Sequence, residues 1–315
     1  MPDITVLRTG AHGTPMSEYA AALRDRLPEQ DIALARTPAD ERELVADARV
    51  VTGGDIDEDL LAQAEELELF AGAYAGYEHL PLDAFKSRDI AVTNAAGVHA
   101  PSAAEQVLGY VLTFARSLHE GWRRQQNREF RHYQAYELKD STVTVVGLGA
   151  IGQGIVQRLQ GFDVDTIGVR YTPEKGGPTD EVIGFDDEAL HEAFARTDYL
   201  VLACPLSDTT RNLVDREALD TLPPESVLVN VARGGVVDTD DLVSALRQEH
   251  IRGAALDVTD PEPLPEDHPL WTLENVVVTP HTAGQTPQYW ERLADILATN
   301  VPRLDADEEF QNRVA

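Results

Sequence analysis

The sequence feature that most constrains the fold is a glycine-rich turn between a strand pattern and a helix pattern. Residues 143–147 are an apolar run, and they lead into Gly147-Leu-Gly149-Ala150-Ile151-Gly152, with the spacing Gly-x-Gly-x-x-Gly. In this pattern the first glycine permits a tight turn, the second lets the backbone approach a pyrophosphate, and the third lets the helix pack closely on the strand. The glycines alone would also suit an ordinary turn. Because the strand and the helix are both present, we predict a dinucleotide-binding segment whose helix N-terminus faces the phosphates.

The segments after this turn keep alternating between strand and helix patterns. The strand patterns cover residues 143–147, 165–169, 199–203, 227–231, 254–258 and 276–279, and the helix patterns cover 151–159, 187–195, 216–222 and 240–248. Six strands joined by crossovers are what a doubly wound parallel sheet of the Rossmann type requires. We therefore predict a dinucleotide-binding domain over residues 101–286.

The first hundred residues show a second series of the same kind. Strand patterns lie at residues 4–8, 50–52, 67–71 and 90–93, and helix patterns at 16–27, 41–48 and 58–64. This alternation again predicts a parallel, doubly wound α/β domain, of the flavodoxin-like type. A last helix pattern at 287–304 is expected to pack back on it. The predicted substrate domain is therefore discontinuous and comprises residues 1–100 and 287–315.

A long helix is predicted between the two domains. Ser102-Ala-Ala-Glu105 has the capping-box pattern, Pro101 precedes it, and no further proline occurs before Pro173. We expect one continuous helix over residues 103–131.

The charge balance excludes several classes of partner. Asp plus Glu number 55 and Lys plus Arg 26, which gives a formal net charge of −29. A chain of this charge repels nucleic acids and anionic membranes, whose binding needs the opposite sign. The acidic residues are spread along the whole chain, and the lysines are limited to Lys86, Lys139 and Lys175. We interpret this as adaptation to a salt-rich cytoplasm, where counterions screen the self-repulsion; the alternative is an ordinary acidic protein.

Other compositional features argue against metal binding, secretion and membrane insertion. Cys204 is the single cysteine, and the nine histidines are scattered. We expect no metal site and no disulfide. The sequence has no apolar run of the length that spans a bilayer, and Met1-Pro-Asp-Ile-Thr-Val6 lacks the pattern of a secretory signal. The expected location is the cytoplasm.

The residues after the second strand of the glycine-turn domain bear on the choice of cofactor. A site for NAD places Asp or Glu there, about 20 residues after the glycines, to bind the ribose 2′-hydroxyl. Here the strand at 165–169 is followed by Arg170-Tyr171-Thr172, without a carboxylate. Arginine can pair with a 2′-phosphate through two parallel hydrogen bonds. The sequence therefore favours NADP, with NAD as the alternative.

Three further segments place polar residues directly after apolar strands. They are Asn230-Val-Ala-Arg233, Asp257-Val-Thr-Asp-Pro-Glu262 and Thr279-Pro-His281-Thr-Ala-Gly284. The carboxyl ends of parallel strands are where open α/β sheets bind ligands. With the glycine turn, this ordered combination resembles the D-2-hydroxyacid dehydrogenases, of the glyoxylate and hydroxypyruvate reductase kind. The resemblance covers nearly the full length, from Ala73-Tyr74-Ala75-Gly76-Tyr77-Glu78-His79 to the segment of His281.

The resemblance implies a catalytic set and a reaction. Arg233 would bind the carboxylate of a small 2-oxo acid and polarise its oxo group, His281 would protonate the alkoxide as hydride arrives, and Glu262 would pair with His281. These residue types suit the tasks, because arginine offers a permanently charged fork and histidine titrates near neutrality. Taken singly, each also suits a structural role: Arg233 a loop salt bridge, Glu262 a surface carboxylate, His281 a loop histidine.

The resemblance also implies the remaining contacts. Substrate would be held by Tyr74, Ala75 and Gly76 in addition to Arg233 and His281, although Tyr74 equally suits aromatic packing. The cofactor would contact Gly147, Gly149, Ala150, Ile151, Gly152, Arg170, Tyr171, Thr172, Cys204, Pro205, Thr210, Val231, Ala232, Arg233, Asp257, His281 and Gly284. The family usually dimerises through the segment of the long helix, so we expect a homodimer.

Alternatives within and beyond this resemblance stay open. Formate dehydrogenases carry glutamine at the position of Glu262, so the glutamate argues against that reaction. Phosphoglycerate dehydrogenases often append a regulatory domain, for which the chain is too short after His281. The choice among glyoxylate, hydroxypyruvate and other 2-oxo acids is open. Non-enzymatic relatives of the corepressor type, which sense dinucleotides and bind protein partners, form a separate hypothesis.

Overall fold

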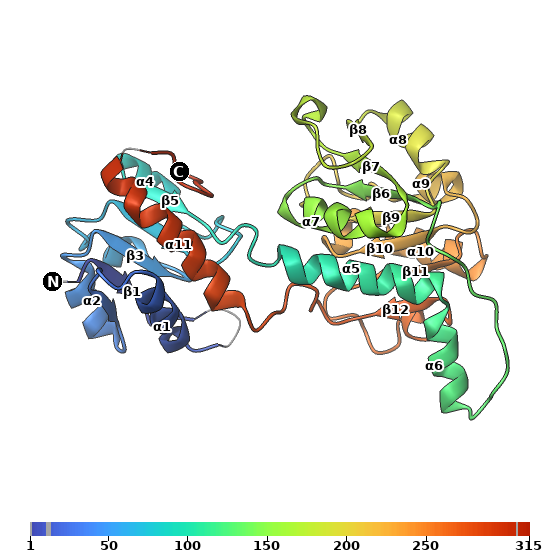
Figure 1. The fold of residues 1–315 in the computed structure, drawn as a ribbon, viewed down its shortest axis with the longest axis horizontal. Helices are drawn as coiled ribbons and strands as arrows, with labels where there is room; N and C mark the ends of the chain where they lie inside the picture. The colour runs from blue at the N-terminus through green and yellow to red at the C-terminus, as the bar shows by residue number, and fades with distance from the viewer. Residues whose placement is uncertain (1, 11–13, 307) are drawn as a thin grey trace. The chain divides into compact units, whose positions relative to one another are not determined.

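The structure is a computed structural model, and it describes residues 2–10, 14–306 and 308–315. The chain divides into two compact units (Figure 1). Unit 1 comprises Met1–Val98 and Thr286–Ala315, and unit 2 comprises His99–Gln285. Each unit has its own parallel sheet, and each is described by itself.

Unit 1 contains a five-stranded sheet in the order β2-β1-β3-β4-β5, with every neighbouring pair parallel. This is the flavodoxin-like order of a doubly wound sheet. Its strands are β1 Ile4–Val6, β2 Ile32–Leu34, β3 Val50–Gly53, β4 Leu69–Gly72 and β5 Ala91–Thr93; its helices are α1 Met16–Arg26, α2 Pro38–Val45, α3 Glu58–Leu61, α4 Leu82–Ser87 and α11 Tyr289–Ala306. The sequence patterns missed β2 and α4, which are short and carry few buried residues.

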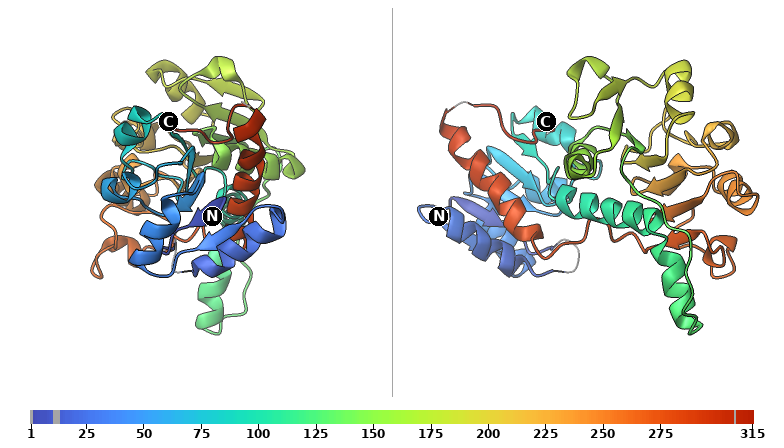
Figure 2. Two further views of the ribbon diagram at one scale, coloured as in Figure 1. Left: turned by 90° about the vertical axis from the view of Figure 1, so that its left-hand side faces the viewer. Right: turned by 45° about the vertical axis from the view of Figure 1, so that its right-hand side comes forward.

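The last helix, α11, packs on α1, the first helix of the chain. The ribbon views show the two helices side by side on one face of the unit 1 sheet (Figures 1 and 2). The ring of Trp290 on α11 stacks on Tyr19 of α1 with 5.1 Å between centroids. At the rim of the contact Arg26 pairs with Glu291 and Asp295 at 2.8 and 2.5 Å. Buried aromatic packing thus completes unit 1 with residues from the end of the chain.

Unit 2 contains a seven-stranded parallel sheet in the order β12-β11-β10-β9-β6-β7-β8. This is the Rossmann order with one strand added at an edge. Its strands are β6 Thr142–Val146, β7 Asp165–Val169, β8 Glu181–Ile183, β9 Tyr199–Leu202, β10 Val227–Asn230, β11 Gly253–Leu256 and β12 Val276–Val278. Its helices are α5 Ala100–Ala115, α6 Leu118–Gln126, α7 Ala150–Leu159, α8 Asp187–Phe194, α9 Arg216–Thr221 and α10 Thr239–Arg247, with short 3-10 turns at Gln160–Phe162, Pro173–Lys175, Gly234–Val236 and Pro269–Trp271. The predicted class of two parallel α/β domains is confirmed.

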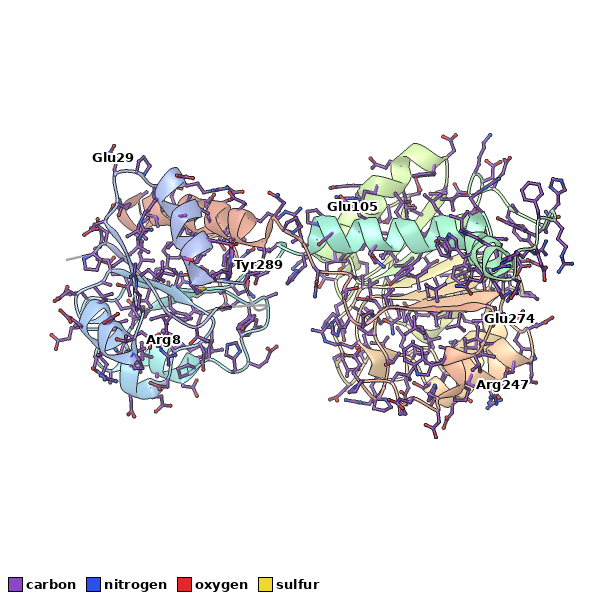
Figure 3. All side chains as sticks on the ribbon, turned by 90° about the horizontal axis from the view of Figure 1, so that it is seen from below. Arg8, Glu29, Glu105, Arg247, Glu274 and Tyr289 are labelled. Atoms are coloured by element: carbon purple, nitrogen blue, oxygen red, sulfur yellow. The ribbon has the colours of Figure 1, made fainter. Side chains whose placement is uncertain are left out.

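The sheet of unit 2 separates two apolar cores. Along β9, Leu200 and Leu202 face a core shared with α8, α9 and α10, whereas Tyr199 and Val201 face a core shared with α5 and α7. Successive residues of a strand point to opposite faces, so strands buried on both sides are apolar throughout. Figure 3 shows α5, with Glu105 labelled, running across one face of the sheet. This double burial explains why the unit 2 strands are visible in the sequence.

Two expectations for the connecting region are wrong. The predicted single helix over 103–131 is two helices, α5 and α6, because the backbone at Ser117 adopts a left-handed conformation with φ +49°. The buried face of α5 ends at Ala115, and α6 buries no residue. The predicted capping box does not form, since α5 begins at Ala100 and the Ser102 hydroxyl donates to the His99 and Gly284 carbonyls.

The expectation of six strands in the sheet of unit 2 is also wrong, because half-exposed β8 adds a seventh.

Within the described residues, no helix is long and apolar enough to cross a membrane. The same residues include no group of three or more His, Cys, Asp or Glu side chains that could hold a metal ion.

Candidate active site

The glycine turn after β6 is shaped by two steric requirements. Gly147 has φ +99°, and a Cβ there would lie 2.7 Å from backbone atoms of Cys204. A Cβ on Gly152 would lie 1.9 Å from the Gly147 carbonyl oxygen. Around Gly149, by contrast, an added Cβ would meet no atom within 4 Å. Two of the glycines are thus required by the fold, and the third leaves the backbone accessible to a ligand.

The N-terminus of α7 suits an anionic ligand. α8, α9 and α10 are capped by the side chains of Asp186, Asp215 and Asp238, but α7 has no side-chain cap and no acidic residue in its first turn. We find no acceptor among the described residues for the N–H groups of Ala150 and Ile151. Free N–H groups and the helix dipole attract phosphate. The residues present therefore fit the pyrophosphate of a dinucleotide.

Arg170 lies at the carboxyl end of β7. Its guanidinium donates to the carbonyl of Gly176, and the described residues include no carboxylate paired with it. Tyr171 packs its ring on Phe185 at 4.7 Å, and its hydroxyl shares a 2.8 Å hydrogen bond with Ser207. Thr172 closes a short turn by accepting from the backbone N–H of Lys175 at 3.1 Å. The end of β7 therefore presents basic and neutral groups.

The loop after β9 supplies the other wall of the glycine turn. Thr210 is buried, and its hydroxyl donates to the Pro205 carbonyl at 2.6 Å and accepts from the Ser207 N–H at 2.8 Å.

Burial raises the pKa of the Cys204 thiol to about 11. The thiol is therefore protonated at neutral pH and is no nucleophile.

Arg233 is the exposed end of a turn that Asn230 braces from inside the sheet. The Asn230 side chain accepts from the Ala232 N–H and donates to the Arg233 carbonyl, both at 3.0 Å. The guanidinium of Arg233 donates to the Ala232 carbonyl at 2.7 Å. Within the described part of the chain it forms no ion pair, which argues against the salt-bridge role that the sequence left open. The bracing role of Asn230 was not predicted from the sequence, where its signal is a polar residue at the end of an apolar strand.

A buried carboxylate holds the turn that carries His281. Asp257 is 2% exposed, and it accepts hydrogen bonds from the Thr279 hydroxyl at 2.5 Å, the Thr282 N–H at 2.9 Å and the Ala283 N–H at 2.8 Å. The Asp257 carbonyl accepts from the His281 N–H at 2.8 Å. His281 has φ +51°, a conformation that a non-glycine residue keeps only where its surroundings impose it.

His281 and Glu262 form a hydrogen-bonded pair. Nδ1 of His281 lies 2.9 Å from Oε2 of Glu262, whose other oxygen accepts from the Thr259 N–H at 3.0 Å. A carboxylate at Nδ1 selects the tautomer with the proton on that nitrogen. Nε2, which has no partner among the described residues, is then the atom that can exchange a proton. The histidine side chain is 51% exposed, so solutes can reach it.

These residues follow adjacent strands of one sheet. Arg233 comes after β10, Glu262 after β11 and His281 after β12, and the three strands are neighbours. The carbonyl of Gly284, past the histidine turn, accepts from Nδ1 of His99 at 2.7 Å. The fold of unit 2 therefore places the three predicted catalytic residues after the carboxyl ends of neighbouring strands.

Tyr74, Ala75 and Gly76 belong to unit 1, where they follow β4. Ala75 and Gly76 are exposed residues, and no acceptor among the described residues takes the protons of their N–H groups. Tyr74 is half-buried, with its hydroxyl 3.4 Å from the Gly10 carbonyl and its ring edge-on to His79. Two consecutive free N–H groups are a suitable receptor for a carboxylate.

Comparison with known proteins gives consistent matches. Residues 108–283 match the family model described as D-isomer specific 2-hydroxyacid dehydrogenase, NAD binding domain. A glyoxylate reductase from Pyrococcus furiosus is 31% identical over 255 residues, which cover 78% of this chain and 75% of that protein. A D-3-phosphoglycerate dehydrogenase from Methanocaldococcus jannaschii is 31% identical over 306 residues, covering 95% of this chain and 58% of that longer protein. A solved D-isomer specific 2-hydroxyacid dehydrogenase from Xanthobacter autotrophicus, in complex with NADPH and MES, has a TM-score of 0.80 and 29% identity, covering 100% of this chain and 98% of that one.

Proposed function

Since the chain belongs to the D-isomer specific 2-hydroxyacid dehydrogenase family, we propose that it reduces small 2-oxo acids to D-2-hydroxy acids with a nicotinamide cofactor. The observation that carries the proposal is the His281–Glu262 pair, 2.9 Å apart, on a turn that buried Asp257 holds. Arg233 follows β10, the strand that neighbours β11 in the same sheet, and it has no carboxylate partner among the described residues.

The residues divide the chemistry among them. The guanidinium of Arg233 binds the substrate carboxylate and draws electron density from the 2-oxo oxygen. When bound, the nicotinamide supplies the hydride. His281 gives the proton on Nε2 to the developing alkoxide, and the reverse reaction returns it. Glu262 orients the ring and stabilises the imidazolium through Nδ1.

The cofactor and the substrate carboxylate would each be held by backbone groups. The free N–H groups of Ala150 and Ile151 beside Gly149 would bind the pyrophosphate. Arg170 would bind the 2′-phosphate of NADP, which we propose as the preferred cofactor over NAD. The N–H groups of Ala75 and Gly76 would bind the substrate carboxylate. Asp257 would act mainly by holding the His281 turn, since both of its carboxylate oxygens accept hydrogen bonds from that turn.

A turnover assay with a panel of 2-oxo acids tests this function. Glyoxylate, hydroxypyruvate and pyruvate would be offered with NADPH or NADH, and the product would be analysed for D and L isomers. We expect oxidation of the cofactor with at least one small 2-oxo acid and, where the product is chiral, the D isomer. If the chain binds the cofactor but reduces none of the panel, the enzyme proposal fails in favour of a dinucleotide-sensing role.

We further propose that the protein works in a salt-rich cytoplasm. Its net charge of −29 gives strong self-repulsion, which salt screens. We expect the melting temperature to rise steeply between about 0.1 M and about 1 M KCl, over which the Debye length falls from about 10 Å to about 3 Å. Salt also strengthens apolar burial, and that effect should continue to grow above 1 M, after screening has levelled off. Equal melting temperatures across the series would leave only an ordinary acidic protein.

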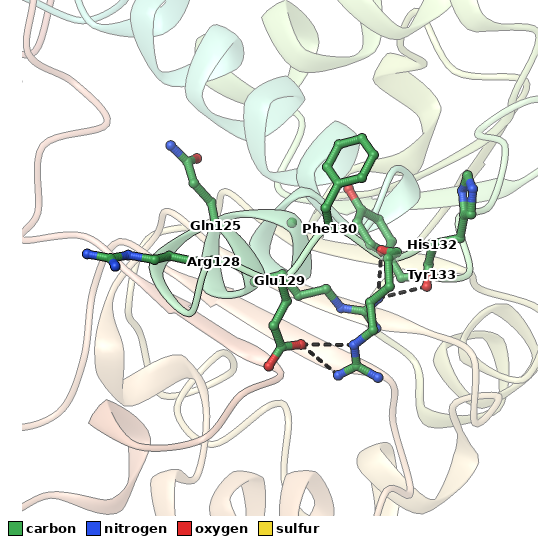
Figure 4. Close-up of a pocket in the computed structure, with 9 residues that line it drawn as sticks. Gln125, Arg128, Glu129, Phe130, His132 and Tyr133 are labelled. Atoms are coloured by element: carbon green, nitrogen blue, oxygen red, sulfur yellow. Dashed lines mark hydrogen bonds and ion pairs between the residues drawn. The ribbon is translucent and has the colours of Figure 1, made fainter.

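We also propose a homodimer formed through α6 and the segment that follows it. α6 buries no residue, Trp122 is 53% exposed and Phe130 is fully exposed. Figure 4 shows Phe130 in the segment after α6, where Arg131 pairs with Glu129. Exposed aromatic side chains gathered on one segment of the chain are typical of a protein interface. Sedimentation velocity should give twice the chain mass, and a monomer at micromolar concentration would contradict the proposal.

A further inference from the structure

The N–H groups of Ala75 and Gly76, for which the described residues offer no acceptor, belong to peptide groups whose carbonyls each accept a hydrogen bond. The carbonyl of Tyr74, in the peptide that carries the Ala75 N–H, accepts from the backbone N–H of Ala95 at 3.0 Å. The carbonyl of Ala75, in the peptide that carries the Gly76 N–H, accepts from the side-chain Nδ2 of Asn94 at 2.6 Å. Since a trans peptide is planar and its C=O and N–H point opposite ways, holding each carbonyl fixes the direction of each N–H.

Asn94 is itself fixed in place. It lies directly after β5 and is 6% exposed, and its Oδ1 accepts from the Ala96 N–H at 3.2 Å. The side-chain amide of Asn94 therefore uses both its donor and its acceptor within the loop. These two hydrogen bonds fix the side chain, so that its Nδ2 stays directed at the Ala75 carbonyl.

The carboxyl-terminal segment of the chain supports this loop. Nδ2 of Asn312 donates to the Asn94 carbonyl at 3.2 Å and to the Ala96 carbonyl at 2.8 Å, and the Asn94 N–H donates to the Asn312 carbonyl at 3.2 Å. Arg313 forms an antiparallel bridge with Thr93 on β5.

A third asparagine ties the same segment to α11. Asn300 is fully buried, its Nδ2 donates to the Gln311 carbonyl at 3.0 Å, and its Oδ1 accepts from the Gln311 N–H at 2.8 Å. Hydrogen bonds of Asn300, Asn312 and Asn94 thus connect α11 to the peptide of Ala75 and Gly76. Nothing in the catalytic chemistry of unit 2 uses these side chains.

We propose that Asn94 is a positioning residue, which orients the Ala75–Gly76 peptide to bind the substrate carboxylate, and that Asn312 secures Asn94 for this task. The inference rests on the proposed function. Donors fixed in advance bind a charged group without the cost of reorganisation. A carbonyl that accepts a hydrogen bond also makes the N–H of the same peptide a stronger donor. The carboxyl-terminal segment then serves substrate binding as well as the fold.

Asn94→Ala tests the inference. We expect KM for the 2-oxo acid to rise about tenfold or more, because the N–H of Gly76 then has no bond that fixes its direction toward the charged carboxylate. kcat and the Kd of NADPH should change little, because the substitution weakens substrate binding and leaves the residues of unit 2 in place. Asn94→Asp should raise KM further, because a carboxylate oxygen would face the Ala75 carbonyl.

A matched control is Asn275→Ala. Nδ2 of Asn275 donates to the Leu246 carbonyl at 3.2 Å, a bond of the same type in unit 2. We expect this variant to lose some thermal stability without a change in KM. Asn312→Ala should raise KM in the same direction as Asn94→Ala, and the double variant should show less than the sum of the two effects, because both act through one peptide.

Two results would overturn the inference. The first is an unchanged KM in Asn94→Ala while the wild-type chain reduces 2-oxo acids, which leaves the proposed function intact. If the wild type reduces none, the proposed function fails, and titration of isotope-labelled protein with oxalate decides the inference alone. Shifts of the Ala75 and Gly76 amide resonances in the wild type that weaken in Asn94→Ala support it. Equal shifts in both proteins, or none in the wild type, are the second overturning result.

Discussion

Replacing His281 with alanine should lower kcat for 2-oxo acid reduction by a factor of about 10²–10⁴, the usual contribution of a positioned acid–base group. The reason is that Nε2 is the ring nitrogen left for proton exchange once Nδ1 is bonded to Glu262 at 2.9 Å. The Kd of NADPH should change little, because the glycine turn and Arg170 lie on other loops of unit 2. Steady-state kinetics with a saturating 2-oxo acid and a separate cofactor titration measure the two effects.

The structure offers a matched control for this variant. Nδ1 of His250 lies 3.1 Å from Oδ1 of Asp220, and the histidine is 46% exposed, close to the 51% of His281. His250→Ala removes a similar histidine–carboxylate pair at a place without proposed chemistry, so its kcat should match the wild type. Glu262→Gln should give a smaller loss than His281→Ala, because the amide keeps a hydrogen bond to the ring but not the charge. A kcat near wild type in His281→Ala would refute the assignment.

Much of unit 2 could be predicted from the sequence, for a physical reason. Its central strands are buried on both faces, so each is largely apolar. β10, for example, is apolar over residues 227–229, and the polar Asn230 ends it at the carboxyl end of the sheet. β8, which begins with exposed Glu181 and is half-exposed, lacks that contrast and was missed. The break between α5 and α6 was missed as well, because the residue that adopts the left-handed conformation there, Ser117, is neither glycine nor proline.

In the candidate site, too, some features could be predicted from the sequence and others could not. The types and order of Arg233, Glu262 and His281 could be read from the sequence, because each follows a strand. The hydrogen bonds of Asp257 to the His281 turn could not, since they join residues more than twenty positions apart through a backbone conformation that depends on the packed sheet. For Asn94, the sequence places a polar residue after a strand, but its bond to the Ala75 carbonyl is a tertiary contact.

Arg170→Asp should reverse or strongly weaken the proposed preference for NADPH over NADH. Arg170 directly follows β7, and its guanidinium pairs with no carboxylate among the described residues, so it can receive a 2′-phosphate. A charge-assisted hydrogen bond contributes about 1.5–3 kcal/mol, which corresponds to about one to two decades in affinity. An aspartate there would repel the phosphate and could accept from the 2′-hydroxyl of NADH. We therefore expect kcat/KM for NADPH to fall about 10- to 100-fold while kcat/KM for NADH falls little or rises.

Arg196→Asp separates this local effect from the change in overall charge. Arg196 is exposed and pairs with Glu181 at the start of β8, so its replacement alters the net charge by the same amount within the same unit. The ratio of kcat/KM values for NADPH and NADH should stay at the wild-type value in that variant. In the wild type the ratio should shrink as KCl rises, because salt screens an exposed arginine–phosphate pair. A wild-type preference for NADH, or an Arg170→Asp variant that loses both cofactors equally, would show that Arg170 does not bind the 2′-phosphate.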